Sequence, residues 1–169
     1  MQQGNRPSVR PQNGRYAPLP KGLPPLAFGR TEGAPALLAG VRVLVVEDDA
    51  DARDLICALL EGAGAKVLCT ESVAEAMGGV YHSFDPDVVL TDYSMPDADG
   101  LDLIRAFRRA PSTRAIAVPI LVLSGHSEDH WRARALEAGA ADLLIKPFDP
   151  ALLVARIAAA VAPGRTGQH

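Results

Sequence analysis

The sequence predicts an α/β fold in which a doubly wound, five-stranded parallel sheet carries helices on both faces. Two observations predict this fold. From Val41 onward, five short apolar runs alternate strictly with five stretches of helical periodicity. The connections between them are short, and strands that are apolar along their whole length are typical of a parallel sheet that is buried on both sides.

The five apolar runs are the predicted strands. They cover residues 41–46, 65–70, 87–92, 119–125 and 141–147. The first strand leads into Glu47 and Asp48, the third ends in Asp92, the fourth carries Ser124, and the fifth carries Lys146. Because the carboxyl ends of parallel strands meet at one edge of the sheet, we expect these side chains to gather there.

The segments between the strands carry helix signals, with apolar residues at four-residue spacing and acidic or hydroxyl residues at the starts. The predicted helices cover residues 49–64, 72–84, 99–110, 127–139 and 149–162. Asp49 is expected at the start of the first helix, and Asp99 and Asp149 are expected as N-caps. Ser72 and Glu75 have the spacing of a capping box, in which the two side chains satisfy each other's backbone N–H groups.

Charge and composition divide the chain into three parts. Residues 1–38 are rich in proline and glycine and are predicted to form a disordered basic extension, followed by a folded domain over 39–162 and a disordered tail over 163–169. Residues 1–40 contain five basic residues and one acid, a charge of +4. Because the net charge of the whole chain is −3, the remaining residues carry −7. An acidic folded domain argues against direct nucleic-acid binding.

Two further classes of protein are excluded by local patterns. No apolar run approaches the ~20 residues that a membrane span needs, and no signal-peptide core is present, so the sequence predicts a cytoplasmic protein without a membrane partner. Cys57 and Cys69 do not form a CxxC pair, which argues against zinc binding and thioredoxin-like chemistry. We therefore expect two buried, reduced thiols.

The acids at the predicted sheet edge suggest a cation and a reaction. Like charges placed side by side are stable only when a cation neutralises them, and an oxygen-only ligand set with room for water favours Mg²⁺. A carboxylate such as Asp92 can attack phosphorus without a general base, because it is already ionised at neutral pH. Lys146 and the hydroxyl of Ser124 would stabilise the transferring group.

Four motifs in this order resemble the receiver domain of two-component response regulators. They are VLVVEDD (43–49), VLTDYSMPDADG (89–100), PILVLSG (119–125) and LLIKPF (143–148), and the resemblance covers residues 41 to 162. It implies a flavodoxin-like (βα)5 fold with strand order 2-1-3-4-5. It also implies a signalling module, not an enzyme, that accepts a phosphoryl group from a partner histidine kinase or histidine phosphotransfer protein.

The same resemblance assigns roles to individual residues. Asp92 aligns with the phosphoryl acceptor, and Lys146 aligns with the lysine that pairs with the phosphoryl group. Asp48 aligns with a direct Mg²⁺ ligand and Glu47 with its acidic companion, while the backbone carbonyl of Ser94 is a further metal ligand. Ser124 aligns with the hydroxyl that turns toward the phosphoryl group, and the bond from Lys146 to Pro147 is typically cis.

One position departs from the family pattern. Leu143 stands where the family often has an aromatic residue that swings inward on activation, so the resemblance implies an altered coupling here. Members commonly use the face around this strand to bind partners, and Trp131 and Leu143 are therefore candidate partner-surface residues. Only seven residues follow Ala162, so we expect a stand-alone receiver that acts on a downstream protein target.

Two alternatives remain open from the sequence. The first is a degenerate receiver that binds proteins independently of phosphorylation; Leu143 and the unusual tail favour it, whereas the complete set of acids, serine and lysine argues against it. The second is a phosphatase-type hydrolase with an aspartyl intermediate, but that class requires a second acid two residues after the nucleophile. Ser94 occupies that position, so general-acid assistance is missing.

Overall fold

A computed structural model of the chain describes residues 36–111, 117–126 and 129–165. Most of the predicted N-terminal extension, most of the predicted C-terminal tail and the first residues of the predicted 127–139 helix lie outside this part. No helix within these described ranges is long and apolar enough to cross a membrane.

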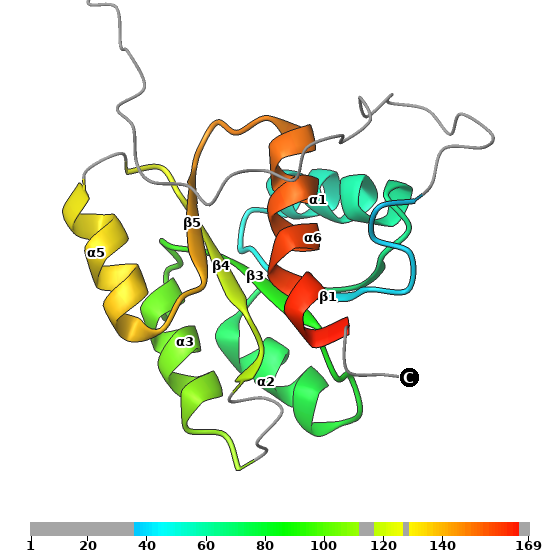
Figure 1. Cartoon of the computed structure of the whole chain (residues 1–169). Coiled ribbons are helices and arrows are strands. Elements are labelled where there is room, and N and C mark those ends of the chain that lie inside the picture. Colours follow the sequence, from blue (N-terminus) through cyan, green and yellow to red (C-terminus); the bar gives the residue numbers. More distant parts are fainter. Residues whose placement is uncertain (1–35, 112–116, 127–128, 166–169) are drawn as a thin grey trace, which may run out of the picture.

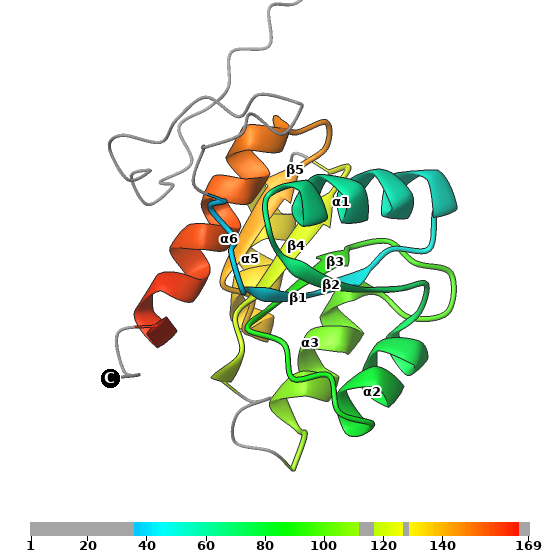
Figure 2. The same cartoon turned by 90° about the vertical axis from the view of Figure 1, so that its right-hand side faces the viewer.

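Within these described residues, five parallel strands form a single sheet in the order β2-β1-β3-β4-β5 (Figure 1 and Figure 2). They are β1 (Arg42–Val46), β2 (Lys66–Thr70), β3 (Val88–Asp92), β4 (Ile120–Ser124) and β5 (Asp142–Ile145). Every neighbouring pair is parallel. The predicted doubly wound sheet and its 2-1-3-4-5 order are therefore confirmed.

Helices cover both faces of this sheet (Figure 2). They are α1 (Ala50–Gly62), α2 (Val73–Tyr81), α3 (Gly100–Arg108), α5 (Asp129–Ala138) and α6 (Pro150–Arg165). Side chains of α1 and α6 pack in one hydrophobic cluster, and side chains of α2, α3 and α5 pack in a second one. Alternate strand residues enter the two clusters, as Val45 and Val46 do, which is why the strands are apolar on both faces.

Polar side chains begin the helices largely as the sequence predicts. Asp49 accepts a hydrogen bond from the Ala52 N–H at 2.8 Å, and Asp99 forms a capping box with Asp102. The capping box predicted for α2 forms only in part. Its serine accepts a hydrogen bond from the N–H of Glu75 at 3.1 Å, but the Glu75 carboxylate accepts from the residue that precedes the cap.

A disulfide joins Cys57 on α1 to Cys69 on β2, and the two Cα atoms lie 6.5 Å apart. The prediction of two free thiols is therefore wrong. Helix α1 packs on the side of the sheet toward which Cys69 points, and both side chains belong to the same hydrophobic cluster. The packing of α1, which spacing along the chain does not reveal, brings the two sulfur atoms together.

The short segment before β1 is part of the folded core. Leu38 is fully buried and its N–H donates to the carbonyl of Ala63 at the end of α1. Gly64 follows with φ at +93°, and a Cβ added there would lie 2.6 Å from the Cβ of Ala36. Glycine at this turn therefore lets the chain before β1 pack closely against the connection from α1 to β2.

Candidate functional site

The strand register places the predicted site residues at one edge of the sheet. Asp92 ends β3 and pairs with Leu123 of β4, so Ser124 lies one step further along the neighbouring strand. Ser124 in turn pairs with Ile145 of β5, and its carbonyl accepts a hydrogen bond from the Lys146 N–H at 2.7 Å. The prediction that these strand ends meet is confirmed.

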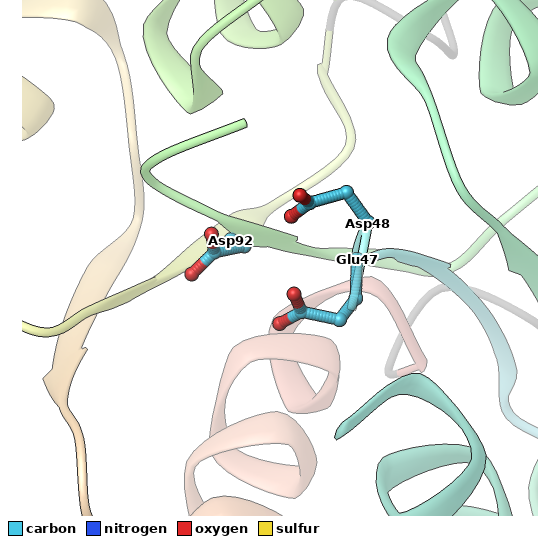
Figure 3. Close-up of side chains that lie close together, drawn as sticks. All are labelled: Glu47, Asp48 and Asp92. Atoms are coloured by element: carbon cyan, nitrogen blue, oxygen red, sulfur yellow. The ribbon is translucent and has the colours of Figure 1, made fainter. Parts of the chain in front are cut away.

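Three carboxylates gather at this edge. One oxygen from each of Glu47, Asp48 and Asp92 lies within 4.8 Å of the others. Figure 3 shows Glu47 and Asp48 extending from the end of β1 toward the side on which Asp92 lies. Glu47 and Asp92 are buried whereas Asp48 is exposed, so the cluster opens to solvent on one side. The donors are all oxygens, which is the chemistry that a hard divalent cation requires.

Lys146 is the positive charge of this site. Its Nζ lies 2.8 Å from an oxygen of Asp92 and 3.0 Å from an oxygen of Glu47. The peptide bond from Lys146 to Pro147 is cis, as the resemblance implied. One ammonium group therefore bridges the acid at the end of β1 and the acid at the end of β3.

The electrostatics of the site follow from burial and from this lysine. Burial raises the pKa of Glu47. Hydrogen bonds from Lys146 and from the Asp49 N–H lower it, but burial outweighs them and the pKa is raised overall. Burial lowers the pKa of Lys146, but its hydrogen bonds to Asp92 and Glu47 outweigh this and raise it above its ordinary value of 10.5. Lys146 therefore stays charged at neutral pH, whereas ionised Glu47 is disfavoured by the fold.

Glu47→Gln is expected to raise the free energy of unfolding of the metal-free protein at neutral pH, because a neutral amide at this buried position avoids the cost of burying an ionised carboxylate. Because the folded pKa of Glu47 is raised, the folded state binds the proton more tightly, and wild-type stability falls as pH rises through the ordinary carboxyl pKa and on to the folded one. Urea unfolding between about pH 4 and pH 8 measures this fall, which Gln removes. Glu61→Gln, on the exposed surface of α1, is the control. Parallel profiles of wild type and Glu47→Gln would contradict the prediction.

The two serines of the predicted site lie in different surroundings. Ser124 is fully buried, and its Oγ accepts a hydrogen bond from the His126 N–H at 3.0 Å. Ser94 is exposed in the loop that follows Asp92. Both therefore lie at the carboxyl edge of the sheet, one beneath its surface and one upon it.

The two candidate partner-surface residues differ in exposure. Trp131 is half-buried on α5, so part of its ring faces solvent. Leu143 is only 1% exposed and belongs to the hydrophobic cluster under α2, α3 and α5. Its expected place on a partner surface is wrong, because β5 is covered at this position and the side chain points into the core.

Two residues that the sequence did not single out shape the site. The guanidinium of Arg53 donates to the backbone carbonyl of Glu47 at 2.9 Å and lies 3.4 Å from that of Asp48. Gly100 begins α3, and a Cβ added there would lie 2.8 Å from the carbonyl oxygen of Asp92. The spacing from the acids to an arginine in the first turns of the next helix was the available signal for Arg53. Nothing local indicated Gly100.

Gly100→Ala is expected to disturb the site without changing any of its charged groups. The added methyl group must displace the backbone of Asp92, and overpacking of this kind costs about 1–3 kcal/mol. Urea unfolding should show that loss. Gly78→Ala in α2 is the matched control, because a Cβ there meets nothing within 4 Å, and it should leave stability unchanged or raise it. Equal stability of the two variants would contradict the prediction.

The chain matches the family model described as the response regulator receiver domain over residues 43–158. It belongs to this family. Receiver domains are signalling modules that take phosphoryl groups from histidine kinases, and phosphorylation and Mg²⁺ binding at an acidic pocket are general features of them. The acid cluster of this receiver domain lies where that pocket is expected.

Known proteins extend the comparison. The receiver domain is 41% identical to the phosphate regulon transcriptional regulatory protein PhoB of Klebsiella pneumoniae over 118 residues, which is 70% of this chain and 50% of the relative. It is 37% identical to the KDP operon transcriptional regulatory protein KdpE of Escherichia coli over 119 residues, again 70% of this chain and 50% of the relative. The chain therefore spans about half the length of these curated relatives.

Solved structures agree with the fold. A putative response regulator from Chloroflexus aurantiacus has a TM-score of 0.68 and 32% identity, covering 73% of this chain and 98% of that one. The chemotaxis response regulator CheY4 of Vibrio cholerae has a TM-score of 0.64 and 27% identity, covering 70% of this chain and 99% of that one. These neighbours match the receiver domain along almost their entire length.

Proposed function

We propose that this receiver domain accepts a phosphoryl group on Asp92 from a histidine of a partner kinase or phosphotransfer protein. The observation that carries the proposal is the position of the Lys146 ammonium, 2.8 Å from the Asp92 carboxylate and beside two further acids. A lone surface aspartate lacks such a cation, whereas an aspartate that must receive a phosphoryl group needs one.

The proposed reaction moves one phosphoryl group between two nucleophiles. A carboxylate oxygen of Asp92 forms a bond to phosphorus while the bond from phosphorus to the donor histidine nitrogen breaks, and that nitrogen keeps the electron pair. The product is an aspartyl phosphate. The step needs no general base, because a carboxylate nucleophile has no proton to lose.

Residues around Asp92 have separate parts in this proposal. Lys146 stays protonated and pairs with an oxygen of the incoming phosphoryl group, exchanging its present contact with Asp92. The hydroxyl of Ser124, on the neighbouring strand, donates to a second phosphoryl oxygen. Arg53 holds the backbone of the two acids that follow β1, which fixes their side chains on the Asp92 side.

Mg²⁺ is the metal that fits these residues. Glu47, Asp48 and Asp92 would hold it together with the backbone carbonyl of Ser94, and the exposure of Asp48 leaves room for water and for a phosphoryl oxygen. When bound, Mg²⁺ supplies positive charge against the carboxylates and the phosphoryl oxygens. The acid cluster has more negative charge than Lys146 alone neutralises, which supports this assignment.

The proposed output is contact with a downstream protein in the cytoplasm. The half-buried Trp131 on α5 is the candidate contact residue, and the acidic folded domain does not favour direct binding to nucleic acid. PhoB, of which the matched region makes up about half, is named a transcriptional regulatory protein. That activity belongs to the whole of that protein.

Incubation with acetyl phosphate tests the proposal, because a small acyl phosphate replaces the kinase. With Mg²⁺ present, the intact mass of the protein is expected to rise by one phosphoryl group, and removal of the metal with a chelator should abolish the rise. No rise under either condition would support the alternative of a degenerate receiver that binds partners independently of phosphorylation. Continuous hydrolysis of generic phosphate esters would instead support a hydrolase.

A further inference from the structure

An aromatic cluster lies directly beside the proposed phosphorylation site. It consists of Tyr93, which follows Asp92, His126, which lies two residues after Ser124, and Trp131 of α5. The ring of Trp131 stacks on that of His126 at a centroid distance of 5.0 Å and an interplanar angle of 26°. It meets the ring of Tyr93 edge to face, also at 5.0 Å. Three separate segments therefore meet at one tryptophan.

The hydroxyl of Ser124 is bound to this cluster through the backbone of His126. Its Oγ accepts a hydrogen bond from the His126 N–H at 3.0 Å and lies 3.4 Å from the His126 carbonyl oxygen. A hydroxyl has a single proton to donate. When Ser124 donates that proton to a phosphoryl oxygen on Asp92, it can no longer donate to His126, and rotation of Oγ removes the accepted hydrogen bond as well.

The other side of Trp131 faces the surface of α5. The exposed His130 ring lies 4.7 Å from the Trp131 ring, and the guanidinium carbon of the exposed Arg134 lies 5.2 Å from its centroid. Tyr93 is 5% exposed and fixes the inner edge of the tryptophan. A shift of His126 therefore changes the surroundings of a ring that contacts the buried Tyr93 on one side and surface groups of α5 on the other.

On the nearby strand β5, the side chain of Leu143 cannot carry the same signal through a hydrogen bond, although its carbonyl accepts one from Arg132 of α5 at 3.1 Å. Leu143 of β5 belongs to the hydrophobic cluster in which Tyr93 and Trp131 also take part, but it has no hydrogen-bonding side-chain group. It can adjust its packing, yet it cannot exchange a hydrogen bond when a phosphoryl group arrives. The hydrogen bonds between Ser124 and the His126 backbone, together with the stack of His126 on Trp131, connect the site to α5.

We propose that Trp131 is a positioning residue for Ser124. Its stacking on His126 holds the Ser124 hydroxyl on the His126 backbone in the unphosphorylated protein. Phosphorylation of Asp92 draws the hydroxyl away, releases His126 from the stack and changes the α5 surface around His130 and Arg134. This inference rests on the proposed function of Asp92, and it names the residues that convert phosphorylation into a change of surface.

The chain contains a single tryptophan, so its intrinsic fluorescence reports on Trp131 alone. Emission and intact mass are measured on the same samples, first with Mg²⁺ and then after acetyl phosphate is added. The wild-type emission is expected to change in proportion to the phosphorylated fraction. His126→Ala keeps the backbone N–H but lacks the ring, so its mass should rise while its emission stays constant.

Two more variants separate a specific relay from a general disturbance. His130→Ala removes a surface neighbour of Trp131 but leaves the stack of His126 on Trp131 in place, and it should keep the wild-type emission change. Ser124→Ala, compared at an equal phosphorylated fraction, should lose it. Trp131→Leu should speed labelling by about two- to tenfold, because the lost stack corresponds to the strength of one aromatic pair.

The outcomes that overturn the inference are distinct from failure of the proposed function. A wild-type protein that gains the phosphoryl mass without any change in emission would overturn the inference and leave the proposed function intact. An equal emission change in wild type and His126→Ala would do the same. Absence of the mass gain would refute the proposed function and the relay together.

Discussion

Replacing Asp92 with Asn is expected to abolish phosphorylation of the protein by acetyl phosphate and Mg²⁺. The amide has nearly the same shape as the carboxylate, and its oxygen can still accept a hydrogen bond from Lys146, but it is not a nucleophile toward phosphorus. Intact mass spectrometry should therefore show one added phosphoryl group in wild type and none in Asp92→Asn.

Asp97→Asn is the matched control for this experiment. Asp97 is exposed in the loop that follows β3, so its replacement removes the same charge from the same surface without touching the acid cluster. It should label as wild type does. Labelling of Asp92→Asn at the wild-type rate would show that another side chain receives the phosphoryl group and would refute the proposed assignment.

Lys146→Met is expected to have the second largest effect. It removes the ammonium that contacts both Asp92 and Glu47, so two buried carboxylates lose their shared cation. Loss of one preorganised charge-stabilising group typically slows a reaction by about 100-fold or more. The initial rate of mass gain at saturating Mg²⁺ should fall by that factor.

Lys66→Met provides the control, because Lys66 is exposed on β2 and is held in the sheet by its backbone N–H. The raised pKa of Lys146 adds a second measurement. Its ion pairs stabilise the fold fully below the ordinary lysine pKa of 10.5 and lose that contribution only as pH rises beyond it. Titration of Lys146 itself should therefore leave the stability difference between wild type and Lys146→Met unchanged through neutral pH, and any change in that range reports the titration of Glu47. An unchanged labelling rate in Lys146→Met would exclude a part for its charge.

The sequence predicts the meeting of Asp92 and Lys146 because both follow from the rules of a parallel sheet. Each residue ends an apolar run, the runs alternate with helices, and right-handed crossovers bring every carboxyl end to one edge. Separation along the chain is then irrelevant. The same reasoning places Glu47 and Ser124, and their burial adds detail without changing the outcome.

Other features depend on how helices rotate and how closely they approach, which sequence periodicity does not fix. The disulfide between Cys57 and Cys69 requires α1 to present one particular face to β2. The need for glycine at position 100 arises because α3 begins so close to the carbonyl of Asp92 that a single methyl group would not fit, and the sequence does not specify this distance. The resemblance places Leu143 correctly on the fifth strand, but it does not reveal that the side chain is buried in the core and not exposed to a partner.

The packing of Leu38 matters for anyone who shortens or tags this gene. This side chain is buried at the end of the sheet where β1 begins, opposite the carboxylates. A shortened protein that lacks it would have a cavity in the core beside α1. A coding region that starts at Ala36 retains it. A fluorescent protein or immobilisation tag fused there would be attached at the amino ends of the strands, away from the acid cluster at their carboxyl ends.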